Sequence, residues 1–155
     1  MKGASETNAA TASSLPRPAP RPDPLTARFW EAVSAGVLEI QHCDGCGTYF
    51  HPPVGICPTC LRNDLSFTPV SGRGTLYSFT LTCSGARHPA FVARTPYVVA
   101  LIELVEQRGL LLFSNLPESE PAELEIGRPV EFYPEVREDG VTVPEFRLLA
   151  SQNEG

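Results

Sequence analysis

Four cysteines within residues 43–60 constrain this chain more than any other sequence feature. They form two Cys-x-x-Cys pairs, with ten residues between the pairs. A two-residue spacer lets both sulfurs of a pair face one centre, so two pairs can supply a tetrahedral four-sulfur metal site. The sequence therefore predicts one zinc ion, with iron as an alternative for the same donor set, bound by Cys43, Cys46, Cys57 and Cys60.

The predicted role of this metal is structural. Four thiolates leave no coordination position for water or substrate. Two disulfides are the alternative, but the N-terminus shows no secretory signal, so we expect a reducing, cytoplasmic location. A thioredoxin-like redox pair lacks its βαβ context. His42 and His51 flank the pairs and are predicted to lie beside the metal site or at the surface, and Cys83 is interpreted as an ordinary loop cysteine.

The pattern outside the cysteines predicts a mainly β chain with one short N-terminal helix. Apolar residues recur at helical spacing over 24–33, and a short strand follows at 37–42. After the cysteines, apolar runs separated by turn signals predict a five-stranded barrel. The five strands are expected at 75–82, 97–105, 110–116, 130–133 and 143–148.

This pattern divides the chain into four segments. Residues 1–24 are rich in Ala, Ser, Thr and Pro and predict a disordered leader. Residues 25–70 hold the helix and the cysteine pairs, 71–149 the barrel, and 150–155 a C-terminal tail.

Charge and hydrophobicity exclude some classes of protein. The formal net charge is −6, and residues 100–155 carry twelve acidic residues against four arginines. An acidic chain repels a phosphate backbone, so nucleic acid is a disfavoured partner. No apolar run reaches the length of a membrane-spanning helix, and we expect no membrane partner.

Several motifs together resemble one known family. They are Phe29-Trp30-Glu31, Gly36-Val37-Leu38, the two cysteine pairs, Gly72-Arg73-Gly74, Pro96–Ala100, Gly127–Val130 and Phe146. Their order, over residues 25–149, resembles the small proteins that join an N-terminal rubredoxin-like zinc ribbon to a C-terminal OB-fold. The resemblance implies a five-stranded OB-fold barrel and a partner of thiolase-fold enzymes or enoyl-CoA hydratases.

The same resemblance implies a non-catalytic accessory subunit that scaffolds or completes an acyl-CoA site in lipid, steroid or polyketide metabolism. A CoA thioester would then be a ligand shared with the large subunit. OB-folds bind ligands through the loop between their first two strands, and loop 83–96 takes that place here. Its cationic and aromatic side chains are the candidate contacts to CoA or to the partner: Arg87, His88, Phe91 and Arg94.

Two other functions stay open on the sequence alone. An OB-fold that binds nucleic acid would use stacking aromatics, and Tyr77, Phe79, Tyr97 and Phe113 could stack. A rubredoxin-like electron carrier would hold iron at the cysteines. A stand-alone enzyme ranks lowest, because no nucleophile elbow or acid–base pair is evident in the sequence.

Overall fold

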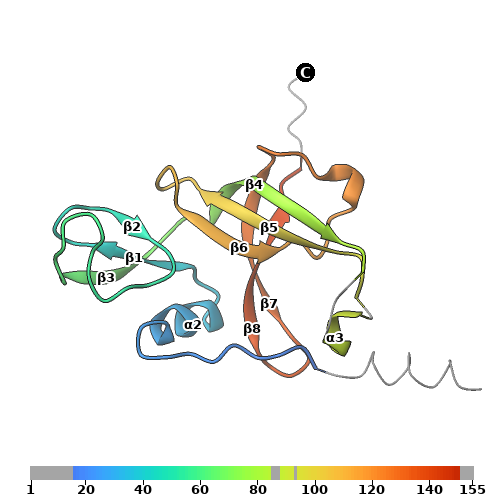
Figure 1. The fold of residues 1–155 in the computed structure, drawn as a ribbon, viewed down its shortest axis with the longest axis horizontal. Helices are drawn as coiled ribbons and strands as arrows, with labels where there is room; N and C mark the ends of the chain where they lie inside the picture. The colour runs from blue at the N-terminus through green and yellow to red at the C-terminus, as the bar shows by residue number, and fades with distance from the viewer. Residues whose placement is uncertain (1–15, 85–87, 93, 151–155) are drawn as a thin grey trace, which may run out of the picture.

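The computed structural model describes residues 16–84, 88–92 and 94–150 and has two β-sheets (Figure 1). A three-stranded sheet has the order β2-β1-β3, and a five-stranded sheet has the order β6-β5-β4-β7-β8. A single helix of two turns, α2 (Ala27–Ser34), lies between them. The predicted mainly β fold with one N-terminal helix, a cysteine ribbon and a five-stranded barrel is confirmed.

Helix α2 begins after a capped turn and ends at a glycine. The Asp23 carboxylate accepts hydrogen bonds from the backbone N–H groups of Leu25 (3.0 Å) and Thr26 (2.8 Å), which satisfies donors that a helix start leaves unpaired. Gly36, at φ +79°, follows the last turn of the helix, where this conformation favours glycine. The buried face consists of Phe29, Ala32 and Val33, so the helix packs onto the core through the apolar residues that predicted it.

The small sheet surrounds the cysteines. Strand β1 (Glu39–Cys43) is central and pairs antiparallel with β2 (Tyr49–Phe50) and β3 (Leu65–Pro69). Only β1 was anticipated from the sequence. Strand β2 has two residues and β3 has no buried residue, so neither carries the alternating burial that reveals a strand in a sequence.

The barrel strands are all antiparallel to their neighbours. They are β4 (Arg73–Thr82), β5 (Tyr97–Leu104), β6 (Leu111–Asn115), β7 (Pro129–Val136) and β8 (Thr142–Leu148). All five were predicted in this order, although β7 is longer at its C-terminal end than the expected 130–133. The interior is filled by side chains with almost no exposed surface, among them Leu76, Ile102, Leu112, Val130 and Phe146.

Side-chain hydrogen bonds join the two outer strands of the five-stranded sheet. The Ser114 hydroxyl on β6 donates to the carbonyl oxygen of Pro144 on β8 (3.1 Å). The Asn115 backbone N–H donates to the Glu145 carboxylate (2.8 Å). Because the backbones of β6 and β8 are not paired in a ladder, these contacts hold the barrel closed at this seam.

The long connections contain two short helical segments. Within the predicted loop 83–96, α3 (Pro89–Val92) forms one turn, and η1 (Pro121–Glu123) lies between β6 and β7. None of the helices in the described part of the chain combines the length and hydrophobicity needed to cross a membrane.

Part of the predicted leader lies against the barrel. Residues 1–15 and 151–155 lie outside the described residues, so most of the leader and the tail remain predictions. Residues 16–24, however, run past the hairpin between β7 and β8 (Figure 1), and Arg17 pairs with Glu135. The sequence did not anticipate these contacts.

Candidate functional site

The sulfur atoms of the two cysteine pairs converge on one point. All four Sγ atoms lie within 4.8 Å of one another, with Cys43 and Cys60 3.5 Å apart and Cys46 and Cys57 3.6 Å apart. Tetrahedral coordination at a Zn–S distance of about 2.3 Å requires sulfurs about 3.8 Å apart. The cluster therefore has the donor chemistry and the size for a tetrahedral four-thiolate site, and Cys83 lies outside it.

Both cysteine pairs use the same backbone turn. Gly47 N–H donates to the Cys43 carbonyl (2.8 Å), and Leu61 N–H donates to the Cys57 carbonyl (2.9 Å). Gly47 and Leu61 both have positive φ, +74° and +60°. A glycine takes this conformation without strain, whereas it is uncommon for a leucine. The repeated turn brings the two pairs face to face.

The polar surroundings favour thiolate at one cysteine of the cluster, Cys46. The hydrogen bond between Cys46 and Thr48 (3.3 Å) lowers the pKa of the Cys46 thiol to about 6. The two nearby histidines are not part of the cluster. His42 Nδ1 lies 3.1 Å from the Asp44 carboxylate. His51 packs on Phe29 with ring centroids 5.0 Å apart, and burial lowers its pKa to about 4.

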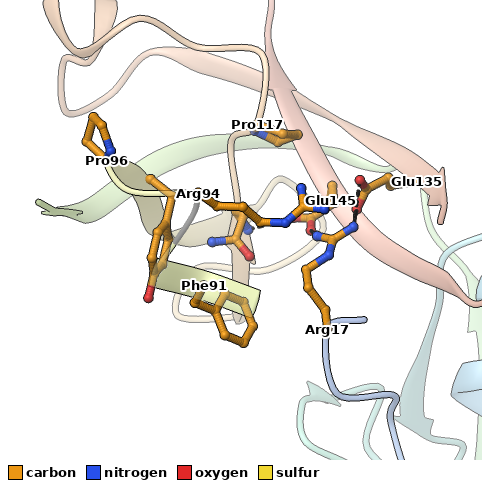
Figure 2. A pocket seen from close by; sticks show the side chains of 9 residues that line it. Arg17, Phe91, Arg94, Pro96, Pro117, Glu135 and Glu145 are labelled. Atoms are coloured by element: carbon orange, nitrogen blue, oxygen red, sulfur yellow. Dashed lines mark hydrogen bonds and ion pairs between the residues drawn. The ribbon is translucent and has the colours of Figure 1, made fainter. Parts of the chain in front are cut away.

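A separate pocket of about 170 Å³ opens at the end of the barrel beside α3 (Figure 2). Its apolar lining comes from the α3 loop and from residues near the strand ends. Its charged lining comes from the leader, from the α3 loop, and from β7 and β8. The residues are Arg17, Phe91, Arg94, Pro96, Tyr97, Asn115, Pro117, Glu135 and Glu145. The pocket therefore combines aromatic surface with two cations and two carboxylates.

Glu145 is the most buried charged group of this pocket. Its carboxylate accepts the Asn115 backbone N–H and lies 3.3 Å from the Ser114 hydroxyl. Burial, reinforced by repulsion from Glu135, raises the pKa of Glu145 above its usual value. Arg17 opposes this shift, with its guanidinium 4.0 Å from the Glu145 carboxylate.

The structure brings two of the four residues predicted for the loop into this pocket. Phe91 and Arg94 both line it, and the Phe91 ring lies 5.8 Å from that of Tyr97. His88 is exposed at the start of α3, where its Nδ1 accepts the Ala90 N–H (3.3 Å). Arg87 lies outside the described residues.

Sequence reasoning missed the acidic half of the pocket. Glu135 and Glu145 lie on strands whose apolar alternation identified them as barrel, and no motif marks either acid. For Glu145, a signal was available: it is an acidic residue within the strand predicted at 143–148. Arg17 could not be found this way, because it belongs to a segment without any periodicity.

Family models match two consecutive parts of the chain. Residues 30–66 match the rubredoxin-like zinc ribbon domain of ChsH2, and residues 67–133 match the C-terminal OB-fold domain of ChsH2. The boundary between the two matches falls within β3, the last strand of the small sheet.

Two curated relatives give the context of such chains. A DUF35 domain-containing scaffold protein of Methanocaldococcus jannaschii is 30% identical over 121 residues, which are 76% of this chain and 83% of the relative. A protein of Thermomonospora curvata named "Probable enoyl-CoA hydratase alpha subunit" is 39% identical over 139 residues, 90% of this chain. This chain spans only 41% of the length of that second relative.

A solved structure is similar over nearly its whole length. It is a chain of the structure described as "Ltp2-ChsH2(DUF35) aldolase", with 37% sequence identity and a TM-score of 0.74. The match covers 83% of this chain and 98% of that chain. The similarity therefore includes both the cysteine ribbon and the barrel.

Proposed function

Because this chain belongs to the DUF35 family, which joins a ChsH2-type zinc ribbon to an OB-fold domain, we propose that it is an accessory subunit of an acyl-CoA enzyme. The partner would be a thiolase-fold subunit, such as a thiolase, aldolase or acyltransferase, or an enoyl-CoA hydratase subunit. The observation that carries the proposal is the 98% coverage of the DUF35 chain in the Ltp2-ChsH2 aldolase structure.

In this proposal the cysteine cluster holds zinc and has no part in the reaction. Cys43, Cys46, Cys57 and Cys60 would bind the ion, which when bound supplies a structural cross-link between the two turns. A ribbon whose central strand has five residues needs such a link, because it buries too little apolar surface to fold alone. None of the five cysteines forms a disulfide, which supports a cytoplasmic location.

The α3 pocket is the proposed contact region for the partner or its CoA thioester. Phe91 offers an aromatic anchor of the kind that dominates protein interfaces. Arg94 is exposed at the rim and could pair with a CoA phosphate, together with Arg87 and His88 on the same loop. The scissile or condensing chemistry would belong to the large subunit.

Co-purification from the native host tests the proposal. We expect the tagged full chain to recover a thiolase-fold or hydratase subunit at fixed stoichiometry by size-exclusion chromatography and mass spectrometry. The chain alone should not turn over acyl-CoA. Thioester turnover by the isolated chain, or a monomer with no acyl-CoA enzyme bound, would overturn the proposal.

A variant series then tests the contact region. Replacing Arg87, Phe91 and Arg94 by Ala together should weaken complex formation or acyl-CoA affinity at least tenfold. Arg108→Ala, an exposed arginine in the hairpin between β5 and β6, is the matched control. If the triple variant and the control bind alike, the α3 loop is not the contact region.

A further inference from the structure

On the acidic side of the α3 pocket, an arginine from the chain's own leader covers the carboxylates. The Arg17 guanidinium donates to both carboxylate oxygens of Glu135 at 2.8 Å and approaches Glu145 at 4.0 Å. Figure 2 shows its side chain pointing from the leader toward these two acids. Only 16% of the Arg17 side chain is exposed, which is unusual for a cation in a segment without secondary structure.

A second arginine, Arg137, holds the backbone of the leader. Arg137, directly after β7, is itself buried and donates to the backbone carbonyls of Arg17 and Pro18 (3.0 Å to Pro18). Asp139 accepts from the same guanidinium at 2.8 Å and fixes its orientation. The hairpin between β7 and β8 therefore binds the side chain of Arg17 and the backbone carbonyls of residues 17–18.

The contact is selective for one of two similar leader arginines. Arg17 and Arg21 are each followed by proline, yet Arg21 is exposed and has no hydrogen bond or ion pair among the described residues. Alternating prolines keep residues 16–24 extended, which lowers the entropy lost on docking. Docking of the leader therefore depends on the sequence position of Arg17 and not on the net positive charge of the leader.

We propose that residues 16–24 form a removable strap that covers the acidic side of the α3 pocket in the free protein by docking Arg17 between Glu135 and Glu145. This inference rests on the proposed function for its consequence: the strap competes with the partner subunit for the pocket lined by Phe91 and Arg94. The pocket is thus a peptide-binding site for a guanidinium followed by proline, occupied by the chain itself until the partner displaces it.

Backbone dynamics of the full chain test whether the strap is docked. The order parameter of the Ala19 amide should be about 0.8 in the wild type and in Arg21→Ala, and below about 0.6 in Arg17→Ala. Unchanged chemical shifts in β4 and β5 would show that the barrel of each variant is folded. An Ala19 value below 0.6 in the wild type, or no fall in Arg17→Ala, overturns the proposal.

A peptide added in trans tests whether the strap covers the acidic side of the pocket. The probe is the acetylated, amidated sequence Leu-Pro-Arg-Pro-Ala of residues 15–19, and the reporter is the Asn115 amide, which donates to Glu145. Millimolar peptide should shift this resonance saturably in Arg17→Ala and leave the wild type unchanged, and a peptide with Ala for Arg should be inert. Equal responses of the two proteins, including none, overturn the proposal.

Partner affinity separates this inference from the proposed function. If the co-purified subunit exists, Arg17→Ala should bind it several-fold more tightly than Arg21→Ala, and equal or weaker binding means that the strap does not compete. If no partner exists, the proposed function fails, whereas the order parameter and the peptide titration still decide whether the strap covers the acidic side of the pocket.

Discussion

The side chain of Gln107 forms two hydrogen bonds with the backbone of Tyr49, on the edge strand β2. Its side-chain oxygen accepts the Tyr49 backbone N–H and its amide nitrogen donates to the Tyr49 carbonyl, both at 2.9 Å. Gln107 lies in the hairpin between β5 and β6, and Tyr49 begins the edge strand of the cysteine ribbon. One amide side chain from the barrel thus pairs with the ribbon as a neighbouring backbone would.

Removing this side chain should loosen the ribbon from the barrel. Gln107→Ala deletes two hydrogen bonds to a partly buried backbone and should lower the free energy of unfolding by about 1–2 kcal/mol. Urea denaturation measures this, and hydrogen exchange at Tyr49 should accelerate. Arg108→Ala, one residue along the hairpin and exposed, should change little. Equal urea midpoints for the two variants would contradict a stabilising role for Gln107.

Gly74 allows a close approach between β4 and β5. A Cβ added at Gly74 would lie 2.6 Å from the Glu103 carbonyl oxygen and 2.7 Å from Ile102 Cγ2. Gly74→Ala should therefore force the strands apart and lower the free energy of unfolding by about 1–3 kcal/mol. Gly55→Ala is the control, because nothing lies within 4 Å of its added Cβ. Thermal denaturation that ranks the two variants alike would refute this packing argument.

Chelation tests the cysteine cluster. The purified protein should contain one equivalent of zinc or iron, and a strong chelator should remove it and unfold the ribbon, because metal binding supplies its folding free energy. Elemental analysis and the amide resonances of β1 follow the two events. Cys57→Ser should lose the ion and Cys83→Ser should keep it. Less than half an equivalent in the wild type, or a ribbon unchanged by chelation, would exclude a structural metal.

The sequence was sufficient where one physical pattern dominates. The spacing of Cys43 to Cys60 places the four thiols together, and the apolar run at 97–105 predicts the barrel strand β5. It was insufficient at Tyr77, because strand alternation over 75–82 predicts that Tyr77, Phe79 and Leu81 share one face. A β-bulge between Leu76 and Ser78 shifts the register with β5, so Tyr77 is exposed. A bulge depends on strand pairing and leaves no signal in the local alternation.

The acidic pocket shows the same limit for the site. Arg17 and Glu135 are 118 residues apart in the chain, and both are of residue types that usually lie in solvent. Their pairing follows from where the barrel places the hairpin between β7 and β8. The α3 loop could be predicted as a contact region because cationic and aromatic residues are clustered there in sequence. The acids that face it could not be predicted, because they are not clustered with it in sequence.

His51 should make the protein less stable in mild acid. Burial lowers its pKa to about 4 in the folded state, whereas an unfolded histidine titrates near 6.5. Between these values the unfolded chain binds the proton and the folded chain does not, so the free energy of unfolding falls as pH drops from 6.5 to 4, by about 3 kcal/mol in total. Urea denaturation at several pH values measures this slope.

A matched pair of variants isolates the histidine responsible. His51→Phe keeps an aromatic ring against Phe29 and should flatten the acid slope, because the unfolded state loses its extra proton. His88→Phe removes a histidine that is exposed at α3 and should leave the slope unchanged. A slope that survives in His51→Phe would assign the acid sensitivity to another group.

Glu145 should produce a slope of the opposite sign. Burial, with repulsion from Glu135, raises its pKa in the folded state, so the folded chain keeps a proton that the unfolded chain has released. Its contribution to stability is present below the unfolded pKa, near 4.3, and is lost as pH rises through the higher folded value. Each pH unit in this window costs at most about 1.4 kcal/mol.

Glu145→Gln keeps an oxygen to accept the Asn115 N–H but cannot ionise. The variant should lack the loss of unfolding free energy that ionisation of Glu145 causes in this window. The difference in unfolding free energy between variant and wild type should therefore shift in favour of the variant as pH rises toward neutrality. Urea denaturation measures this difference. Glu131→Gln is the control, since that carboxylate lies on the barrel surface with Arg147.

Arg17→Ala should raise the pKa of Glu145 further, because the guanidinium opposes the shift. A carboxyl carbon resonance of Glu145 that titrates identically with and without Arg17 would contradict the electrostatic coupling across the pocket.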